Sequence, residues 1–166
     1  MNKLVKLLLP LISLTLLIAC SEQQQQQQQV VLQAQAIESS DECHLCGMLI
    51  SNFSGPKGEL YRKDRGETVH KFCSTRDMFS FYLDPENKRN VTSIYVHDMS
   101  KMPWDEPNDG YFVDARVAWF VVGSSKTGAM GKTLASFSKE GDAKAFSREF
   151  GGDVLAFDNV DMSTLM

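Results

Sequence analysis

The N-terminal end of the chain limits how much of it can form a folded domain. Two lysines precede the apolar run of residues 7–18, which ends in Ala19 and Cys20. This run is short for a membrane span and no stop-transfer pattern follows it, which is typical of an export signal. A small residue before a cysteine, with Leu17 two positions ahead of Ala19, is the lipobox pattern of a lipidated cysteine. We therefore expect a lipoprotein signal peptide over residues 1–19 and lipid attachment, as palmitate, at Cys20.

Removal of the signal leaves 147 of the 166 residues, enough for one domain or two small ones. Without its two lysines the chain has 15 basic and 21 acidic residues, a net charge of −6. This charge argues against nucleic acid as a partner, because nucleic-acid binding depends on basic contacts to phosphate. Membrane attachment is therefore expected from the lipid. Residues 20–36 contain seven consecutive glutamines, and this composition predicts a disordered tether ahead of a domain beginning near Ile37.

Lipidation of Cys20 leaves an odd number of cysteines in the folded region: Cys43, Cys46 and Cys73. Disulfides are the usual expectation for an exported protein. Three cysteines, however, leave at least one thiol unpaired, which indicates reactivity or metal binding. A thioredoxin-like role is disfavoured, because the Cys-x-x-Cys pair is followed by a short apolar run and a turn where that motif needs a helix. No proton donor stands at a telling spacing from the cysteines, so we do not expect an enzyme.

Zinc is one metal that the cysteines could bind. Cys43 and Cys46 have the spacing of a zinc knuckle, and Cys73 with His70 or His44 would complete a Cys3His set. The second Cys-x-x-Cys or His pair that usually completes such a site is absent. A structural zinc site therefore stays open as an alternative.

Copper(I) is the other candidate, and the methionines favour it. Met48 follows the Cys-x-x-Cys pair directly, and Met130 stands between two glycines in a predicted turn. Thioether sulfur is a good ligand for Cu(I) and a poor one for zinc. We expect a site built from the Cys43 or Cys46 thiolate with the Met48 or Met130 thioether, and with the auxiliary residues Cys73, His97 and Met99.

The first half of the domain predicts the order strand, strand, helix, strand. We expect strands over residues 46–50 and 67–72, separated by a polar connection. Ser74 is a good N-cap for the helix that follows, and Pro85 marks its end. The β-branched and aromatic residues from Val91 onward predict the third strand.

The second half predicts the same order again. Strands are expected over residues 117–123 and 132–137, followed by a helix from about Asp142 and a last strand over 153–157. When the segment from Lys71 is aligned with the segment from Ser136, Ser138 in the second half takes the position of Cys73 in the first. We therefore expect an α+β fold of two similar ββαβ units sharing a core, the first over residues 37–105 and the second over 106–166, which includes the C-terminal tail.

Five short motifs, in this order and at these separations, are those of one family: "ECHLCGM", "KFCST", "YVHDM", "FVVGSSKTGAMG" and "LASF". The chain resembles the NosL family from Asp41 to Phe157, and the lipobox agrees with this. The resemblance implies a fold of two ββαβ units related to the organomercurial-lyase accessory fold. The family's CxxCGM falls on Cys43, Cys46 and Met48, and its GAMG falls on residues 128–131.

The resemblance also implies a function. It implies a periplasmic Cu(I) chaperone that supplies copper for the copper–sulfide centre of nitrous-oxide reductase, the enzyme that ends denitrification. It further implies work with the ABC transporter complex NosDFY and a lipid anchor in a membrane, for which we expect the outer membrane. A second metal such as zinc stays open. The alternative is a zinc-stapled docking module of the same assembly machinery.

Overall fold

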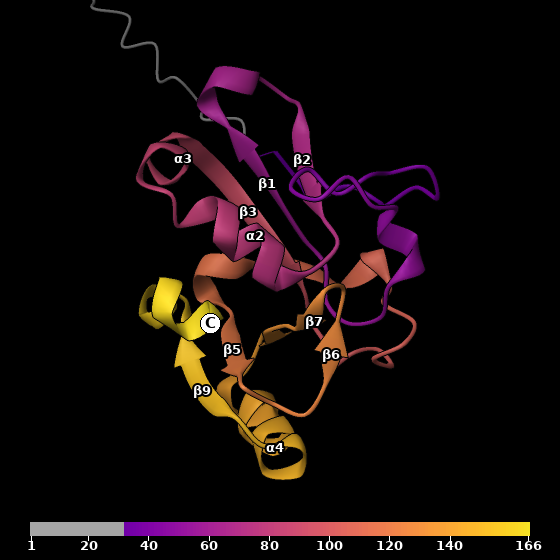
Figure 1. Cartoon of the computed structure of the whole chain (residues 1–166), viewed down its shortest axis with the longest axis vertical. Helices are drawn as coiled ribbons and strands as arrows, with labels where there is room; N and C mark the ends of the chain where they lie inside the picture. The colour runs from indigo at the N-terminus through magenta and orange to yellow at the C-terminus, as the bar shows by residue number, and fades with distance from the viewer. Residues whose placement is uncertain (1–31) are drawn as a thin grey trace, which may run out of the picture. The chain divides into compact units, whose positions relative to one another are not determined.

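Two antiparallel sheets with helices packed against them make up the computed structural model, which describes residues 32–166 (Figure 1). The expected signal peptide, the lipidated Cys20 and the glutamine tract lie outside the described residues. Within residues 32–166, no helix is both long and apolar enough to cross a bilayer. Helices and sheets are both present, which confirms the α+β class.

The first sheet has four strands in the order β2-β1-β3-β4, and all neighbours are antiparallel. Its strands are β1 (Gly58–Arg62), β2 (Val69–Phe72), β3 (Val91–His97) and β4 (Phe112–Asp114). Two helices connect β2 to β3, namely α2 (Thr75–Tyr82) and α3 (Pro85–Asn90). The sequence predicted β2, α2 and β3 correctly, and the Ser74 side chain caps α2 by accepting from the Asp77 backbone N–H.

The second sheet has three strands in the order β8-β5-β9. They are β5 (Trp119–Val122), β8 (Ala135–Phe137) and β9 (Asp153–Ala156), with α4 (Glu140–Phe150) between β8 and β9. The hairpin of β6 (Thr127–Gly128) and β7 (Gly131–Lys132) is inserted between β5 and β8. In both sheets the first strand therefore lies between the second and the third, which is compatible with two related ββαβ units.

Short 3-10 helices complete the described chain: Ile50–Asn52, Lys63–Arg65, Asp109–Tyr111, Ala115–Val117, Phe157–Asn159 and Met162–Leu165. β4 pairs with β3 of the first sheet, although it follows the expected boundary between residues 105 and 106. The α3 helix after Pro85 was not predicted. Asp84 caps it, and proline suits the first helical turn, where its missing N–H costs nothing.

The strand expected over residues 46–50 is wrong, and the first strand of the sheet is β1. Residues 44–46 form a turn that Gly47 closes with a φ of 72°, and Leu49 makes only an isolated bridge to Glu42. The residues of β1 lie in the segment that the sequence predicts to be a polar connection. Glycine is required there, because a Cβ on Gly58 would lie 2.4 Å from the Met78 sulfur on α2.

Residues of both sheets share the larger apolar core. The Phe79 ring on α2 lies 5.0 Å from that of Phe120 on β5 and 5.5 Å from that of Phe157. A smaller cluster under α4 contains Val121 and Phe137 of the second sheet. The larger core thus holds α2 in place from both sides, and with it the residues at the start of that helix.

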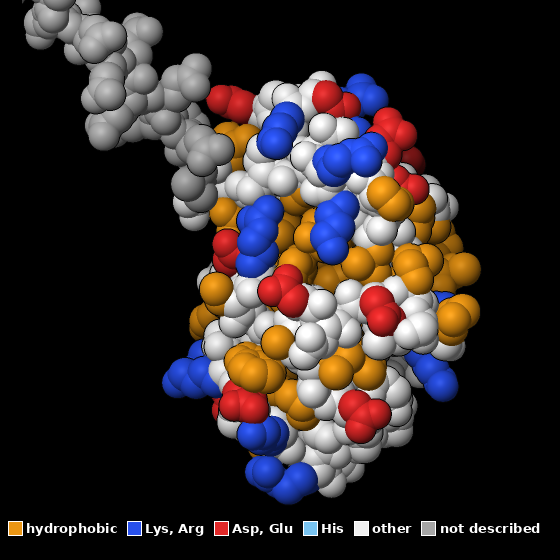
Figure 2. Space-filling model, turned by 90° about the vertical axis from the view of Figure 1, so that its left-hand side faces the viewer, with side chains coloured by type: hydrophobic (Ala, Val, Ile, Leu, Met, Phe, Trp, Pro, Cys, Tyr) orange, Lys and Arg blue, Asp and Glu red, His pale blue; other side chains and the backbone are white. Residues whose placement is uncertain are grey.

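On the face drawn in Figure 2, the basic and acidic side chains of the described residues are interspersed, with apolar patches between them. This face is therefore not a continuous basic surface of the kind by which proteins bind nucleic acid.

Candidate metal centre

Residues 41–50, the cysteine loop, carry the first two cysteines on a tight turn. The Cys43 N–H donates to the Met48 carbonyl at 2.8 Å, and the Gly47 N–H donates to the Cys43 carbonyl at 2.8 Å. The His44 N–H donates to the Lys71 carbonyl of β2, which ties the loop to the sheet. This turn points Cys43 inward, where it is buried, and leaves Cys46 exposed.

The junction between β2 and α2 carries the third cysteine. Cys73 follows the last residue of β2 and is fully buried. Its thiol donates to the Asp77 carboxylate, with an Sγ to Oδ2 distance of 2.9 Å. Ser74 caps the helix by accepting from the Asp77 N–H at 3.0 Å, so the same cap orients both side chains.

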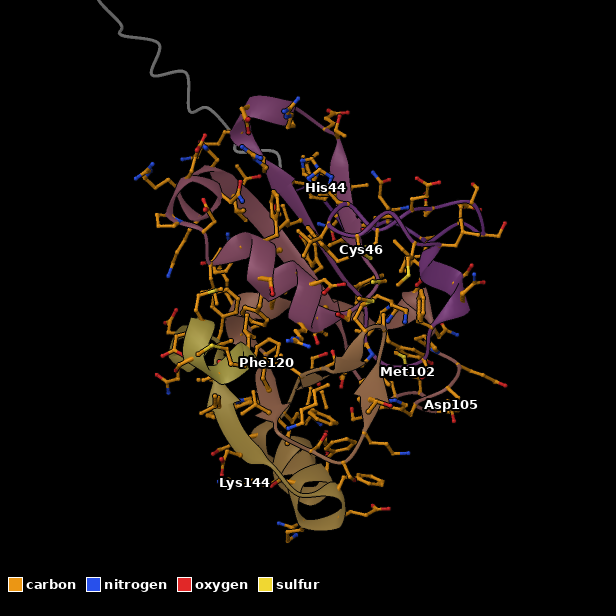
Figure 3. All side chains as sticks on the ribbon, in the orientation of Figure 1. His44, Cys46, Met102, Asp105, Phe120 and Lys144 are labelled. Atoms are coloured by element: carbon orange, nitrogen blue, oxygen red, sulfur yellow. The ribbon has the colours of Figure 1, made fainter. Side chains whose placement is uncertain are left out.

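The loop and the helix together form a cluster of four potential metal ligands: Cys43, Cys46, Cys73 and Asp77. One ligand atom from each lies within 4.8 Å of all the others. The Cys46 and Cys73 sulfurs are 3.5 Å apart, and the Cys43 sulfur is 3.9 Å from Asp77 Oδ2. Three of the four side chains are buried, whereas Cys46, labelled in Figure 3, is exposed, so solvent reaches the cluster at Cys46.

The charges in this cluster are coupled. A hydrogen bond with Cys73 lowers the pKa of Cys43 to about 4, although burial opposes this. The same hydrogen bond and burial raise the pKa of Cys73. Burial also raises the pKa values of Cys46 and Asp77. The lowered pKa makes Cys43 the thiol of the cluster that gives up its proton most readily, whereas a metal must displace protons from Cys46 and Cys73 to bind them.

The two histidines of the expected zinc set lie beside each other and outside the four-ligand cluster. Their Nδ1 atoms are 3.3 Å apart and their ring centroids are 4.1 Å apart. His70 is 8% exposed, and its Nε2 has no partner among the described residues. Instead of His44 or His70, Asp77 supplies the fourth potential ligand.

The methionines of the expected copper site lie in different places. Met48 is on the cysteine loop and half-buried. Met130 is in the β6–β7 turn, 64% exposed, with a φ of 60°, which is rare outside glycine. Thr133, just after this hairpin, contacts Thr75 on α2, with 2.9 Å between the two hydroxyl oxygens. Thr75 is two residues after Cys73, so this contact ties the hairpin to the helix start that carries Cys73. In Figure 3 the tip of the β6–β7 hairpin points upward, toward the level at which Cys46 is labelled.

The structure does not bring His97 and Met99 to the cysteines. His97 is fully buried, its Nδ1 accepts from the Lys57 N–H, and its Nε2 lies 3.0 Å from the Asp109 carboxylate. Met99 is buried in the smaller apolar cluster under α4. Both nitrogens of His97 are thus engaged, and neither residue is placed as an auxiliary ligand.

The sequence did not predict Asp77 as part of the site. It was interpreted only as a residue of the helix cap, and no proton acceptor or donor was expected near the cysteines. The available signal was its spacing of four residues from Cys73 across a helix start, which brings the carboxylate back toward the thiol.

A family model described as NosL matches residues 34–165. A copper-binding lipoprotein NosL from Stutzerimonas stutzeri is 49% identical over 134 residues, covering 81% of this chain and 69% of that protein. A second, from Achromobacter cycloclastes, is 33% identical over 151 residues, covering 89% and 76%.

A solved structure is also similar. The crystal structure of the copper chaperone NosL from Shewanella denitrificans superposes with a TM-score of 0.78 at 60% identity, covering 80% of this chain and 98% of that one. These relatives are named as copper-binding lipoproteins or as a copper chaperone, and not as enzymes.

Proposed function

We propose that this chain, which belongs to the NosL family, is a copper carrier that holds Cu(I) on its three clustered cysteines and releases it through the exposed one. The observation that carries the proposal is the convergence of Cys43, Cys46 and Cys73 at one open point. Soft thiolate sulfur selects Cu(I) over harder metals. Like its relatives, the chain would serve as a carrier and not as an enzyme.

The ligand set that we propose is the three cysteine sulfurs, with thioethers from Met48 or Met130 as supplementary ligands. Asp77 has a different role. Its carboxylate is a hard ligand that suits Cu(I) poorly, and it already accepts a hydrogen bond from Cys73. Asp77 would therefore orient Cys73 and accept its proton when the metal binds.

Release would take place at Cys46. A carrier must let a receiving protein attack the bound metal, which requires at least one exposed ligand. Cys46 is exposed, and exposed apolar side chains lie on both sides of it in the loop, at Leu45 and Leu49. Met130, also exposed, would be the first ligand to exchange, because its hairpin turn is not covered by other described residues.

The route of the copper follows from the family. We propose delivery to the copper–sulfide centre of nitrous-oxide reductase during its assembly, in cooperation with the ABC transporter complex NosDFY. The chain would work in the periplasm, attached through lipid on Cys20 to a membrane, which we propose to be the outer one. The names of the relatives support a lipoprotein that binds copper.

A competition assay with bicinchoninate tests the copper site. A Cys43→Ser, Cys46→Ser double variant should lose most of its Cu(I) affinity, and Met130→Leu should lose part of it. Met162→Leu is the matched control, because Met162 is a similarly exposed methionine in the C-terminal 3-10 helix. Full affinity in the double variant would refute the cysteine site. Equal affinities of the two methionine variants would refute the role of Met130.

The second candidate is a zinc-stapled docking module, and one observation favours it. The three cysteines and Asp77 supply four potential ligands within 4.8 Å, which is enough for a closed tetrahedral zinc site. Metal removal separates the two functions. A structural zinc would be needed for folding, whereas a carried copper would leave the core of Phe79, Phe120 and Phe157 folded. Unfolding by a chelator would support the docking module.

A further inference from the structure

The three cysteines of the described region are all free thiols, and two of them touch. Cys46 Sγ lies 3.5 Å from Cys73 Sγ, whereas a disulfide bond is about 2.05 Å long. The gap of roughly 1.5 Å can be closed by movement of the exposed turn alone, because Cys46 lies on that turn and Cys73 is fixed at the start of α2.

We propose that Cys46 and Cys73 form a disulfide when the centre carries no metal, and that this bond closes the site to copper. The sequence would suggest the other pair, because Cys43-x-x-Cys46 is a familiar redox spacing. The structure favours Cys73 as the partner. The Cys73 sulfur is in contact with the Cys46 sulfur at 3.5 Å and lies outside the turn, whereas the Cys43 amide and carbonyl are both committed to the hydrogen bonds that close the turn.

The reaction begins at the one thiol that solvent reaches. The Cys46 thiol loses its proton and attacks a disulfide of small-molecule or protein origin, which forms a mixed disulfide and releases one thiolate. Cys73 then attacks the Cys46 sulfur, forms the internal disulfide and releases the second thiolate. The two protons of the cysteines end on the two released thiols, and the incoming disulfide is the species that is reduced.

Metal and disulfide are mutually exclusive, because both use the same two sulfurs. This consequence depends on the proposed function, in which these sulfurs bind Cu(I). The bond would leave Cys43 as the only free thiol of the cluster, too few soft ligands to hold copper against competition. Bound copper would in turn protect Cys46 and Cys73 from oxidation. In an oxidising compartment, the chain could then load copper only while Cys46 and Cys73 are reduced. The disulfide would thus distinguish chains that cannot accept copper from chains that can.

The test uses the full chain, reduced, freed of metal and exposed to glutathione disulfide. Remaining thiols are alkylated and tryptic peptides are mapped by mass spectrometry. Trypsin cuts after Lys71 and Arg76, so Cys73 lies in a peptide of its own, residues 72–76. We expect this peptide to be cross-linked to the one that carries Cys46, and the cross-link should persist in Cys43→Ser. Cu(I) affinity of the oxidised chain should fall by roughly 100-fold or more, since even outer-shell changes cost about 10- to 100-fold.

Two results would overturn the proposal. One is a disulfide between Cys43 and Cys46, seen as an uncross-linked, alkylated peptide 72–76. The other is alkylation of all three thiols after exposure to glutathione disulfide. Cu(I) binding by the reduced chain is measured separately. If the reduced chain fails to bind copper while the cross-link forms, the carrier function fails and the bond between Cys46 and Cys73 is established.

Discussion

A buried carboxylate in the first sheet should make the stability of the fold depend on pH. Glu59 on β1 is fully buried; its Oε1 accepts from the Gln35 N–H at 2.7 Å, and its Oε2 has no partner among the described residues. Lys71 lies opposite it on β2, but the Lys71 ammonium is paired with Asp41 at 2.6 Å. Burial therefore raises the pKa of Glu59 from 4.5 to about 7.

The sign and size of the effect follow from linkage. Folding raises the pKa of Glu59, so the folded state binds this proton more tightly than the unfolded state does. The resulting contribution to the free energy of unfolding is fully present below pH 4.5 and is lost as the pH rises through about 7. The difference in pKa corresponds to roughly 3 kcal/mol at pH 8. Glu59→Gln keeps the oxygen that accepts from Gln35 and removes the charge. We expect the variant to be more stable than the parent by up to about 3 kcal/mol at pH 8, with little difference at pH 4.5.

Urea unfolding of both metal-free proteins at several pH values measures this difference directly. Other groups titrate alike in the two proteins, so the free energy of unfolding of the variant minus that of the parent isolates Glu59. The difference should grow between pH 5 and pH 8. A constant difference across this range, or a parent that gains stability relative to the variant as pH rises, would refute the reasoning.

Three further substitutions and one control test the fold and its connection to the site. Gly58→Ala should destabilise the protein by about 1–3 kcal/mol in thermal unfolding, because its Cβ would clash with Met78; no loss would mean that α2 can move away from β1. Ser74→Ala should cost about 1 kcal/mol and also weaken Cu(I) binding, because the lost cap orients Asp77; unchanged affinity would show that the cap is only structural. Phe79→Ala should cost about 3–5 kcal/mol, whereas Val117→Ala, at a position 73% exposed, should cost almost nothing.

Much of the fold follows from local signals. The Ser74 cap marks the start of α2, and the β-branched run marks the start of β3 at Val91. The double glycine after residue 150 marks the end of α4, and all three elements are where the sequence places them. β1 escaped prediction because its residues contradict the usual pattern. Glu59 in β1 is ionisable yet fully buried, and Lys57 directly before the strand is buried because its ammonium donates to the Phe53 and Ser54 carbonyls. Such compensation depends on residues that only the folded chain brings near.

The site was predictable only in part, for a similar reason. The odd number of cysteines indicated a metal centre, and the structure brings Cys43, Cys46 and Cys73 together. Asp77 was missed because a carboxylate at a helix start already has a local explanation as a cap. His97 looked available in sequence, but in the fold Lys57 and Asp109 engage both of its nitrogens.

X-ray absorption of the Cu(I)-loaded chain at the copper edge tests the copper site most directly. The three-cysteine centre predicts a first shell made of sulfur, with one sulfur fewer in Cys46→Ser. A shell dominated by nitrogen or oxygen, or a sulfur count that Cys46→Ser does not change, would contradict the assignment of the centre to these cysteines.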